Sequence, residues 1–475
     1  MVVFNILKLY RGFDKQNRDW PQIYVILLAS LGGFSSCALF SWPSPSIPIL
    51  ISNSSYIEYV TLEEASYFSI ISSISTIVAT PLVAILMNAI GRKKMITFMA
   101  IPHMLSWILI AVARNIICLY VSRAIYGISD AILYCVIPTY VSEIATPKVR
   151  GSWGNLIMIS VFLGQFLINV VGAYYDIITT ALVFVTLPIV HFALMLSAPE
   201  SPYFLLMKNK ETHAEESLKY LRWNENVKEE FTLLVKDVQR QTSESGTLMD
   251  LFIIETNRKA LSIALAMRMF QQFSGFSAFA VYTQYMFSLA GGNLLASDCA
   301  IIFTGVSLLA GTLSSLVVDK FGRRPLMVFS NLGCTIALSI ESIYFLIMHE
   351  TNLNVSDFTW VPLAGMVLYI ITSTAGLGIL PSLMVGELFS ASIKSKAVGV
   401  LSIFFSFCTI FVPKLFQLLS TNFHILVFVA MDGRYGESGD VNSAPGVDNN
   451  AWTMDIGGSV PYHNNNPSNS QIGKT

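Results

Sequence analysis

The sequence is short of charged residues for its length. Of its 475 residues, 12% are charged and 53% are hydrophobic. A soluble chain usually carries about a quarter charged residues, so this one has too little polar surface to cover several soluble cores. The composition is typical of a protein whose outer face contacts lipid.

Other features are missing as well. The formal net charge of −1 gives no basic excess for binding nucleic acid. The six cysteines are scattered through apolar stretches without a CxxC pair or histidine partners, so we expect small hydrophobic residues rather than disulfides or metal ligands. No nucleophile–base or metal-binding constellation is present, which predicts neither an enzyme nor a bound cofactor. The N-terminal segment lacks the h-region of a signal peptide, so the first apolar span is expected to remain as a helix.

Apolar segments of membrane-spanning length recur along the chain. A helix needs roughly 20 residues to cross the hydrocarbon core, and helices satisfy their own backbone groups in lipid. Six segments lie near residues 21–40, 65–88, 95–113, 116–140, 153–174 and 177–197, and five follow near residues 260–289, 297–318, 325–348, 360–385 and 397–420. The sequence therefore predicts an all-α membrane protein with eleven spans.

The lysines and arginines predict the orientation of these spans. They gather in the loops of one side at residues 92–94, 148–150, 320–324 and 394–396, and the N-terminal segment adds Lys8, Arg11, Lys15 and Arg18. The positive-inside rule places this side, with the N-terminus, in the cytosol. The opposite side receives two acceptor sequences for N-glycosylation, at Asn53 and Asn354.

Residues 198–258 form a charged connection between the sixth and seventh spans. Thr212 and Glu215 have the spacing of a capping box at a helix start. An apolar stripe at helical spacing follows at Phe231, Leu234, Val235 and Val238. We expect short amphipathic helices packed beneath the membrane bundle, with the binding of a partner helix as the alternative.

The two halves of the chain repeat a signature. A Gly-Arg pair follows both the second and the eighth span, and a glutamate precedes a basic residue by seven positions in each half. Many secondary transporters are built from such duplicated halves of about six helices. We expect one half at residues 1–197 and another at 259–431, joined by the connection at 198–258 and followed by a disordered tail at 432–475.

Seven short motifs are spread from about residue 20 to about residue 420. They are Arg123-Ala-Ile-Tyr-Gly127, Pro138-Thr-Tyr-Val-Ser-Glu143, Arg150-Gly151, Pro199-Glu-Ser-Pro202, Gln271-Gln-Phe-Ser-Gly275, the run 319–324 and Gly386-Glu-Leu388. In these motifs and their order the chain resembles the sugar porter family of the major facilitator superfamily, and within it insect trehalose and hexose transporters. No binding partner other than a sugar and the lipid bilayer is implied, and the oligomeric state stays open.

The resemblance implies a fold of two pseudo-symmetric six-helix halves in the plasma membrane. It further implies facilitative uniport of a sugar, trehalose or a hexose, by alternating access. Two alternatives remain: a membrane sensor or binding protein that does not transport, and an incomplete product that does not mature.

A charged network at the cytosolic helix ends is also implied by the resemblance. Ionised side chains near lipid are costly unless paired, and in this family such a network closes the cytosolic side in one state. Simple anchoring of the helix ends is the alternative. Asn88 stands where the family usually has aspartate, so that part of the network should be weaker. The predicted members are Asn88, Gly91, Arg92, Glu143, Arg150, Glu200, Asp319, Gly322, Arg323, Glu387 and Lys394.

The resemblance places sugar contacts at Gln165, Gln271 and Gln272. Sugar hydroxyls need neutral hydrogen-bonding groups and an aromatic plate, whereas hydrogen bonds between helices are the alternative role for these amides. Several further site positions depart from the family pattern, which has amides at Ser277 and Ser307, tryptophan at Ser382, and an Asn-Trp pair at Phe405-Ser406. Their loss weakens hexose binding or enlarges the pocket for a bulkier molecule.

Energy coupling is expected to be absent. Proton-coupled relatives carry a carboxylate in the first span, and residues 21–50 contain none. Asp130 is the remaining mid-membrane acid, and a buried acid is the natural proton carrier. We expect Asp130 to pair with Arg123 on the same helix, with Gly127 leaving room between them. A proton relay through Asp130 is the alternative.

The end of the chain also differs from the family pattern. Only residues 424–431 are apolar after the eleventh span. A run of about eight residues covers less than half of the hydrocarbon core at 1.5 Å per residue. We therefore expect the twelfth helix to be truncated or missing, with an alternative exon or a gene-model error favoured over a true eleven-helix transporter. Low stability and poor surface delivery should follow.

Overall fold

The computed structural model describes residues 19–52, 55–57, 59–243, 247–290, 294–350, 358, 360–389 and 391–422. The predicted glycosylation sites Asn53 and Asn354 lie outside these residues, and so do the apolar run at 424–431 and the tail at 432–475. The side chain of Asp319 is not described either. The predictions at these positions stay predictions.

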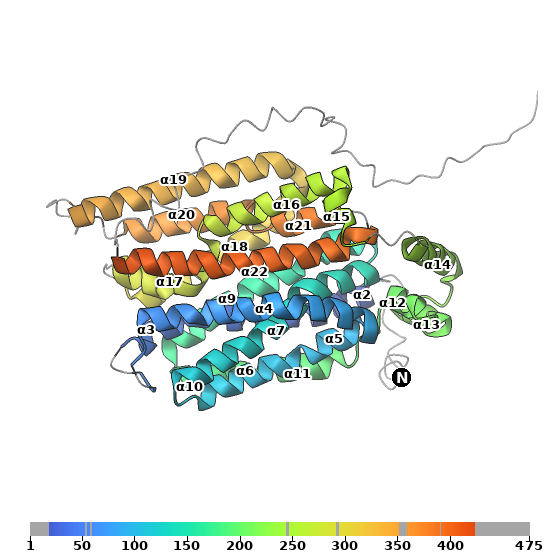
Figure 1. Ribbon diagram of the computed structural model, residues 1–475, viewed down its shortest axis with the longest axis horizontal. Coiled ribbons are helices and arrows are strands. Elements are labelled where there is room, and N and C mark those ends of the chain that lie inside the picture. The colour runs from blue at the N-terminus through green and yellow to red at the C-terminus, as the bar shows by residue number, and fades with distance from the viewer. Residues whose placement is uncertain are drawn as a thin grey trace, which may run out of the picture. The chain divides into compact units, whose positions relative to one another are not determined.

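The first half of the chain forms a bundle of long helices (Figure 1). Its helices are α2 (Trp20–Ser41), α3 (Pro43–Leu50), α4 (Leu62–Ile90), α5 (Arg92–Phe98), α6 (Ala100–Val112), α7 (Ile116–Ile144), α8 (Pro147–Trp153), α9 (Leu156–Tyr174), α10 (Ile177–Phe184) and α11 (Thr186–Met195). Some neighbouring helices together form one membrane span. Helices α2 and α3, for example, meet at Trp42, where Pro43 starts a new helix, and the span continues to Leu50.

The second half repeats this pattern. Its helices are α16 (Glu255–Phe273), α17 (Phe276–Ala290), α18 (Ala296–Phe321), α19 (Arg323–Glu350), α20 (Val361–Ala375), α21 (Leu380–Leu388) and α22 (Ala391–Asn422). Ten helices of the described residues are long and apolar enough to cross a membrane. The expected seventh span is not among them, because Gly275 at φ +93° separates α16 from α17 and because α16 carries charged residues.

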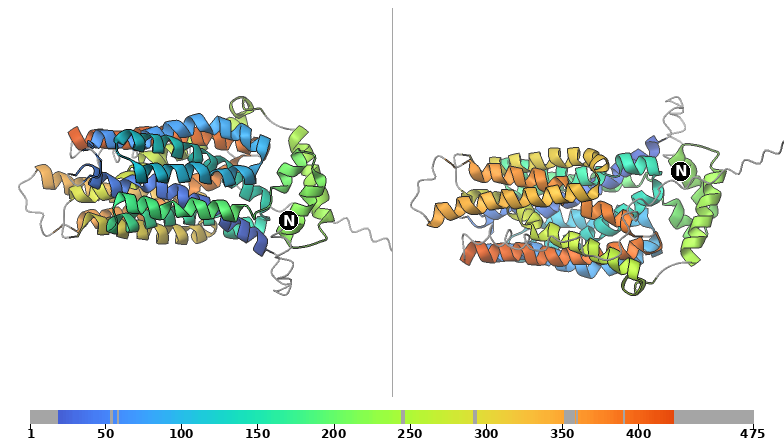
Figure 2. Two further views of the ribbon diagram at one scale, coloured as in Figure 1. Left: turned by 90° about the horizontal axis from the view of Figure 1, so that it is seen from below. Right: turned by 90° about the horizontal axis from the view of Figure 1, so that it is seen from above.

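The connection between the halves forms α12 (Pro202–Met207), α13 (Glu211–Arg222), α14 (Lys228–Ser243) and α15 (Asp250–Ile253). Figure 2 shows α12 to α14 together beyond one end of the bundle. The predicted stripe is confirmed, since Phe231, Leu234 and Val235 pack against Val238, Leu206 and Ala214. The predicted capping box is wrong: α13 already begins at Glu211, with Lys210 as its N-cap.

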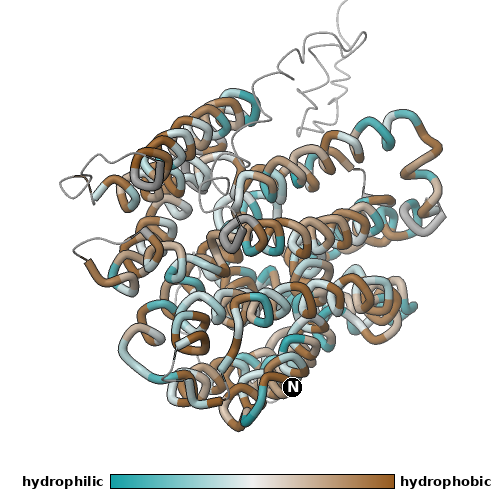
Figure 3. The backbone as a smooth tube through the Cα atoms, turned by 60° about the vertical axis from the view of Figure 1, so that its left-hand side comes forward, coloured by the Kyte–Doolittle hydropathy of each residue, from teal (hydrophilic) through white to brown (hydrophobic). Residues whose placement is uncertain are grey.

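The membrane helices expose apolar side chains on their outer faces. On α4, Val78, Leu82 and Ile85 are 62%, 58% and 67% exposed. Hydrophobic positions likewise run along the helices of the bundle in Figure 3. Such surfaces agree with the lipid-facing exterior that the composition predicts.

The two ends of the bundle differ in charge and in packing. The basic end is where α4 stops at Ile90 and α18 stops at Phe321, beside the connecting helices; the other is the opposite end. Near the opposite end one apolar core contains Trp42 and Phe68 of the first half together with Phe279 of the second. Near the basic end each half has its own core, around Met87 in one and Phe389 in the other. The halves therefore share apolar packing chiefly toward the opposite end.

Candidate functional site

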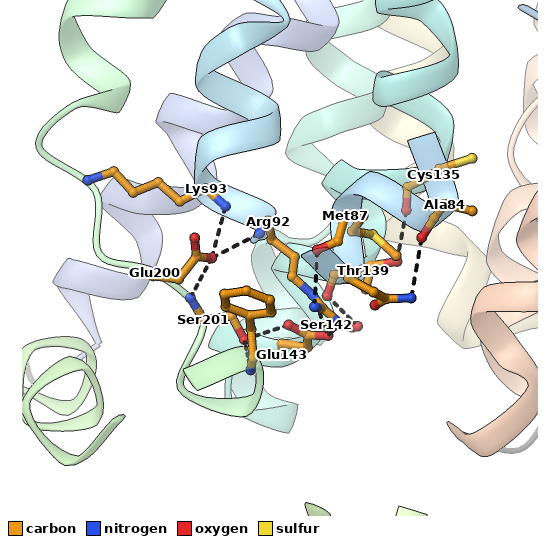
Figure 4. A network of polar contacts seen from close by, with 12 residues as sticks. Ala84, Met87, Arg92, Lys93, Cys135, Thr139, Ser142, Glu143, Glu200 and Ser201 are labelled. Atoms are coloured by element: carbon orange, nitrogen blue, oxygen red, sulfur yellow. Dashed lines mark hydrogen bonds and ion pairs between the residues drawn. The ribbon is translucent and has the colours of Figure 1, made fainter. Parts of the chain in front are cut away.

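A buried ion pair joins α5 to α7 at the basic end. Arg92 Nη2 lies 3.0 Å from Glu143 Oε1, and these side chains are only 4% and 11% exposed. Arg92 Nη1 also donates to the Met87 carbonyl at 3.5 Å, and the Arg92 guanidinium lies over the Phe204 ring. The hydroxyl of Ser201 donates to the second oxygen of Glu143, so both ions are well satisfied (Figure 4).

Glu200 caps the start of α5 from the connecting segment. Its Oε1 accepts hydrogen bonds from the backbone N–H groups of Arg92 and Lys93, each at 3.0 Å. A carboxylate at a helix N-terminus satisfies orphan donors and is favoured by the helix dipole. Figure 4 shows Glu200 and Glu143 approaching Arg92 from different elements. Helix α13 holds Glu200 in turn, since Ser217 donates to its carbonyl at 2.6 Å.

Gly91 makes this approach possible. It has φ +106°, which is unfavourable for residues with a side chain. A Cβ atom at this position would overlap with Glu200 Oε2. The glycine of the basic turn is therefore needed both for the backbone angle and for the cap.

The second half repeats the arginine–glutamate contact. Arg323 Nη2 lies 2.8 Å from Glu387 Oε1, and Arg323 Nη1 donates to the Val318 carbonyl at 3.2 Å. Gly322 precedes it at φ +79°, as Gly91 precedes Arg92. The carbonyl that accepts lies five residues before the arginine in both halves. The repeated signature in the sequence thus corresponds to a repeated geometry.

Other predicted members of the network stand apart from these pairs. Asn88 is exposed and donates to the Ala84 carbonyl of its own helix, and its predicted weaker place in the network stays a prediction. Arg150 is exposed, and no ion pair of the described residues includes it. Lys394 of α22 is partly buried, and its positive charge is repelled by the like charge of Arg150. All ion pairs formed by the predicted members within the described residues stay inside one half.

Three of the predicted sugar contacts are buried polar groups without a hydrogen-bond partner among the described residues. Gln272 is completely buried, and neither its amide nitrogen nor its oxygen has a hydrogen-bond partner in the described part of the chain. The hydroxyls of Ser277 and Ser307 are likewise buried and have no hydrogen-bond partner in that part of the chain. Buried polar groups are nearly always hydrogen-bonded, so each such group needs an explanation.

The remaining predicted contacts differ from one another. Gln165 of α9 is buried, and its backbone carbonyl accepts from the Asn169 side chain. Gln271 is engaged within the protein, because its amide donates to the Gly378 carbonyl at 3.2 Å. Ser382 accepts from Arg268. The Gln271 amide thus bonds the segment between α20 and α21, and its contact with a sugar stays a prediction.

Arg268 was not singled out in the sequence. It lies on α16, about 20 Å from the first residue of that helix at 1.5 Å per residue. An arginine at the centre of a membrane helix costs about 2.5–3.5 kcal/mol on insertion scales. In the sequence, Arg268 is marked only by its position away from the charged helix ends and by the two glutamines that follow it.

Asp130 and Arg123 do not pair, contrary to expectation. Asp130 accepts hydrogen bonds from Tyr126 at 3.0 Å and from Ser36 at 3.3 Å. Arg123 instead donates to the Leu39 carbonyl at 2.6 Å. Its guanidinium lies 4.6 Å from the centre of the Trp42 ring.

Gly127 also serves a different purpose from the expected one. A Cβ atom there would overlap with the backbone of α4, whose Thr76 donates to the Gly127 carbonyl at 3.0 Å. The small residue lets α7 approach α4 closely, as small residues do between membrane helices. It does not make room for an ion pair.

The cysteines match their prediction. All six are free, and Cys118 is the one that is not fully buried. Among the described residues no group of three or more histidine, cysteine or acidic side chains is arranged to hold a metal ion.

Comparison with known proteins places the chain among transporters. A family model described as "Sugar (and other) transporter" matches residues 46–433. Facilitated trehalose transporter Tret1 of Drosophila mojavensis is 30% identical over 415 residues, covering 86% of this chain and 48% of that protein. Tret1 of Aedes aegypti is 31% identical over 418 residues, covering 86% and 51%. The chain thus spans about half the length of these relatives, although it spans 77% of the Tret1 of Culex quinquefasciatus, at 31% identity.

Solved structures show the same fold. The xylose transporter XylE from E. coli in a partially occluded inward-open conformation superimposes with a TM-score of 0.72 at 18% identity, covering 86% of this chain and 94% of that one. The major facilitator superfamily proton:xylose symporter XylE bound to 6-bromo-6-deoxy-D-glucose gives 0.73 at 18% identity, covering 88% and 93%. The chain therefore belongs to the family of sugar (and other) transporters, has the fold of the major facilitator superfamily, and is not an enzyme.

Proposed function

We propose that the protein carries a sugar across the plasma membrane by facilitative uniport. The observation that carries this proposal is Gln272, a completely buried amide without a hydrogen-bond partner in the described residues. Leaving such a group unpaired costs about 1–3 kcal/mol, which a sugar hydroxyl would recover by donating to it and accepting from it. Ser277 and Ser307 add two unpaired hydroxyls of the same neutral character.

The packing of the halves supports alternating access. The shared apolar core closes the molecule near the opposite end, while the halves have separate cores near the basic end. Rocking of two rigid halves about a central site would separate the halves at the opposite end and bring them together at the basic end. Arg92–Glu143 and Arg323–Glu387 keep the helix ends of each half together during such a motion, and their role as a gate belongs to this proposal.

The orientation and the substrate are parts of the same proposal. The basic end would face the cytosol together with the N-terminus, as the positive-inside rule requires. Trehalose or a hexose is the proposed cargo, because relatives over most of this chain are named facilitated trehalose transporters. Unit boundaries at residues 197, 258 and 431 complete the proposed organisation.

The test compares two completely buried glutamines. Gln272→Ala should weaken sugar binding by about 1–3 kcal/mol, or roughly fivefold to 150-fold, because a sugar hydroxyl loses its partner. Gln22→Ala serves as the control, since the side-chain oxygen of Gln22 on α2 already accepts from the Thr146 N–H group at 2.8 Å. Binding is measured on purified protein by the change in thermal stability with trehalose and glucose. If Gln272→Ala binds these sugars as well as the parent does, the amide is structural and the proposal fails.

A further inference from the structure

The guanidinium of Arg268 lies at the junction of the two halves. Nη1 donates to Gln271 Oε1 at 2.9 Å, and Nη2 donates to Ser382 Oγ at 3.0 Å. The guanidinium carbon lies 5.3 Å from the centre of the Phe405 ring on α22. That ring lies 5.3 Å from the ring of Tyr134, which belongs to α7 of the first half. Arg268 therefore reaches the surface along which the halves meet.

The charge of Arg268 has no counter-ion in the described part of the chain. Both of its hydrogen-bond acceptors are neutral oxygens, and its buried Nε has no acceptor. The carboxylate of Asp130 and the guanidinium of Arg268 both act electrostatically on Tyr134. Asp130, however, forms its hydrogen bonds with Ser36 and Tyr126 rather than with Arg268. A cation at membrane depth without a carboxylate partner marks a functional site.

The contacts of Arg268 coincide with departures from the family pattern. Ser382 stands where tryptophan is usual, and Phe405 stands where asparagine is usual, and these two side chains hold the guanidinium. The site has thus lost an amide and a tryptophan ring in the same place where it has gained a cation. A neutral sugar can accept hydrogen bonds from the guanidinium but does not balance its charge.

We propose that Arg268 binds the carboxylate of an acidic sugar, so that the substrate class is a hexuronate or an aldonate. This inference rests on the proposed function, because it assumes a sugar site between the halves. The guanidinium has a planar fork of donors that fits a carboxylate with two parallel hydrogen bonds. The unpaired amide of the neighbouring Gln272 serves the hydroxyls of the same molecule.

The first experiment uses a matched pair of ligands on the purified protein. Glucuronate and glucuronamide have the same hydroxyls, but only glucuronate is charged. Glucuronate should stabilise the protein against heat at a concentration at least tenfold lower than glucuronamide. Lactate, a carboxylate with one hydroxyl, should be a poor ligand. Equal binding of glucuronate and glucuronamide overturns the role of the charge, and equal binding of lactate overturns the sugar.

Variants then locate the effect at Arg268. Arg268→Met should remove the preference for glucuronate, and Arg268→Lys should retain part of it, because lysine keeps the charge without the fork. Arg258→Met is the control, since Arg258 is an exposed arginine on the same helix. A preference that survives in Arg268→Met contradicts the assignment. Should Arg268→Met fail to fold, the comparison of Arg268→Lys with the parent decides: an unchanged preference also contradicts it.

Transport by proteoliposomes separates this inference from the proposed function. Uptake of glucuronate, an anion, should increase several-fold with an interior-positive potential, whereas uptake of glucose should not respond. Transport of neutral sugars without binding of glucuronate overturns the inference and leaves the proposed function standing. Binding of glucuronate that depends on Arg268, without transport of any sugar, overturns the proposed uniport and supports recognition of the anion.

Discussion

Lys414 of α22 lies 3.1 Å from the hydroxyl of Ser66 on α4, measured from its Nζ, and so connects the two halves near the opposite end. The same ammonium group lies 3.7 Å from Glu63 Oε1 and 4.8 Å from the centre of the Tyr67 ring. Four side chains of different character thus meet where the halves must separate if the opposite end opens. The contact is the counterpart of the ion pairs at the basic end, which stay within one half.

Lys414→Met should therefore favour opening at the opposite end. A partly exposed pair contributes about 0.2–1 kcal/mol, so the population of the open form should rise a few-fold. Spin labels at Tyr59 and Trp360, which are 66% and 62% exposed, report the distance between the halves there on a cysteine-free background. Lys414→Arg is the control that keeps the charge. An identical distance distribution in Lys414→Met and the parent contradicts the prediction.

The two arginine–glutamate pairs should differ in their effect on stability. Glu143→Gln leaves Arg92 buried without its anion, which costs about 3–5 kcal/mol. Glu387→Gln should cost at most about 1 kcal/mol, because solvent screens the more exposed pair. The side chains of Arg92 and Glu143 are 4% and 11% exposed, whereas those of the second pair are 29% and 38% exposed. Thermal unfolding of the purified variants measures the difference, and equal shifts in Tm would show that burial does not set the strength of these pairs.

Gly91→Ala should be strongly destabilising. The new methyl group would meet Glu200 and Phe204 at a backbone angle that only glycine adopts easily, so a loss of about 1–3 kcal/mol is expected. Gly399→Ala on α22 is the matched control, because nothing lies within 4 Å of the added methyl and no positive φ is involved. Thermal unfolding again provides the measurement. Similar stability of the two variants would contradict the proposed need for glycine beside the Glu200 cap.

Transport should not depend on a pH gradient. Residues 21–50 carry no acid, and the buried Asp130 is satisfied by hydroxyl groups rather than by a cation. Glu341 on α19 is a second buried acid of the described helices and is tested alongside it. Downhill flux into proteoliposomes should be the same with and without a proton gradient, and neither Asp130→Asn nor Glu341→Gln should change that. Uphill uptake driven by protons, and lost in Asp130→Asn, would show that Asp130 is a proton carrier.

The sequence was sufficient for most of the membrane-spanning helices and for the paired signatures. Apolar runs mark the helices directly, and the duplicated Gly-Arg turns correctly placed Arg92 near Glu143 and Arg323 near Glu387. These residues sit at helix ends, where position along the chain nearly determines position in space. The seventh span was harder to predict, since the break at Gly275 depends on a backbone angle.

Residues within the helices could not be placed in the same way. Whether a side chain faces its own helix, a neighbour or lipid depends on the rotation of the helix, which small steric contacts decide. Gly127 packs on α4 and Arg123 donates to the Leu39 carbonyl, so the spacing to Asp130 was misleading. Asn88 likewise donates to the Ala84 carbonyl of its own helix, which the sequence did not indicate. Arg268 contacts Ser382 and Phe405, which are more than a hundred residues away in the sequence, so its role could not be inferred from its neighbours along the chain.

The most direct test of transport is counterflow in liposomes that contain the purified protein. Vesicles are preloaded with unlabelled trehalose, glucose or glucuronate, and the entry of a trace of the same labelled sugar is followed without a proton gradient. A uniporter that alternates access should give a transient accumulation of label that disappears with Gln272→Ala and persists with Gln22→Ala. Entry of label no faster than into protein-free vesicles, for every sugar and with the parent chain, would contradict the account.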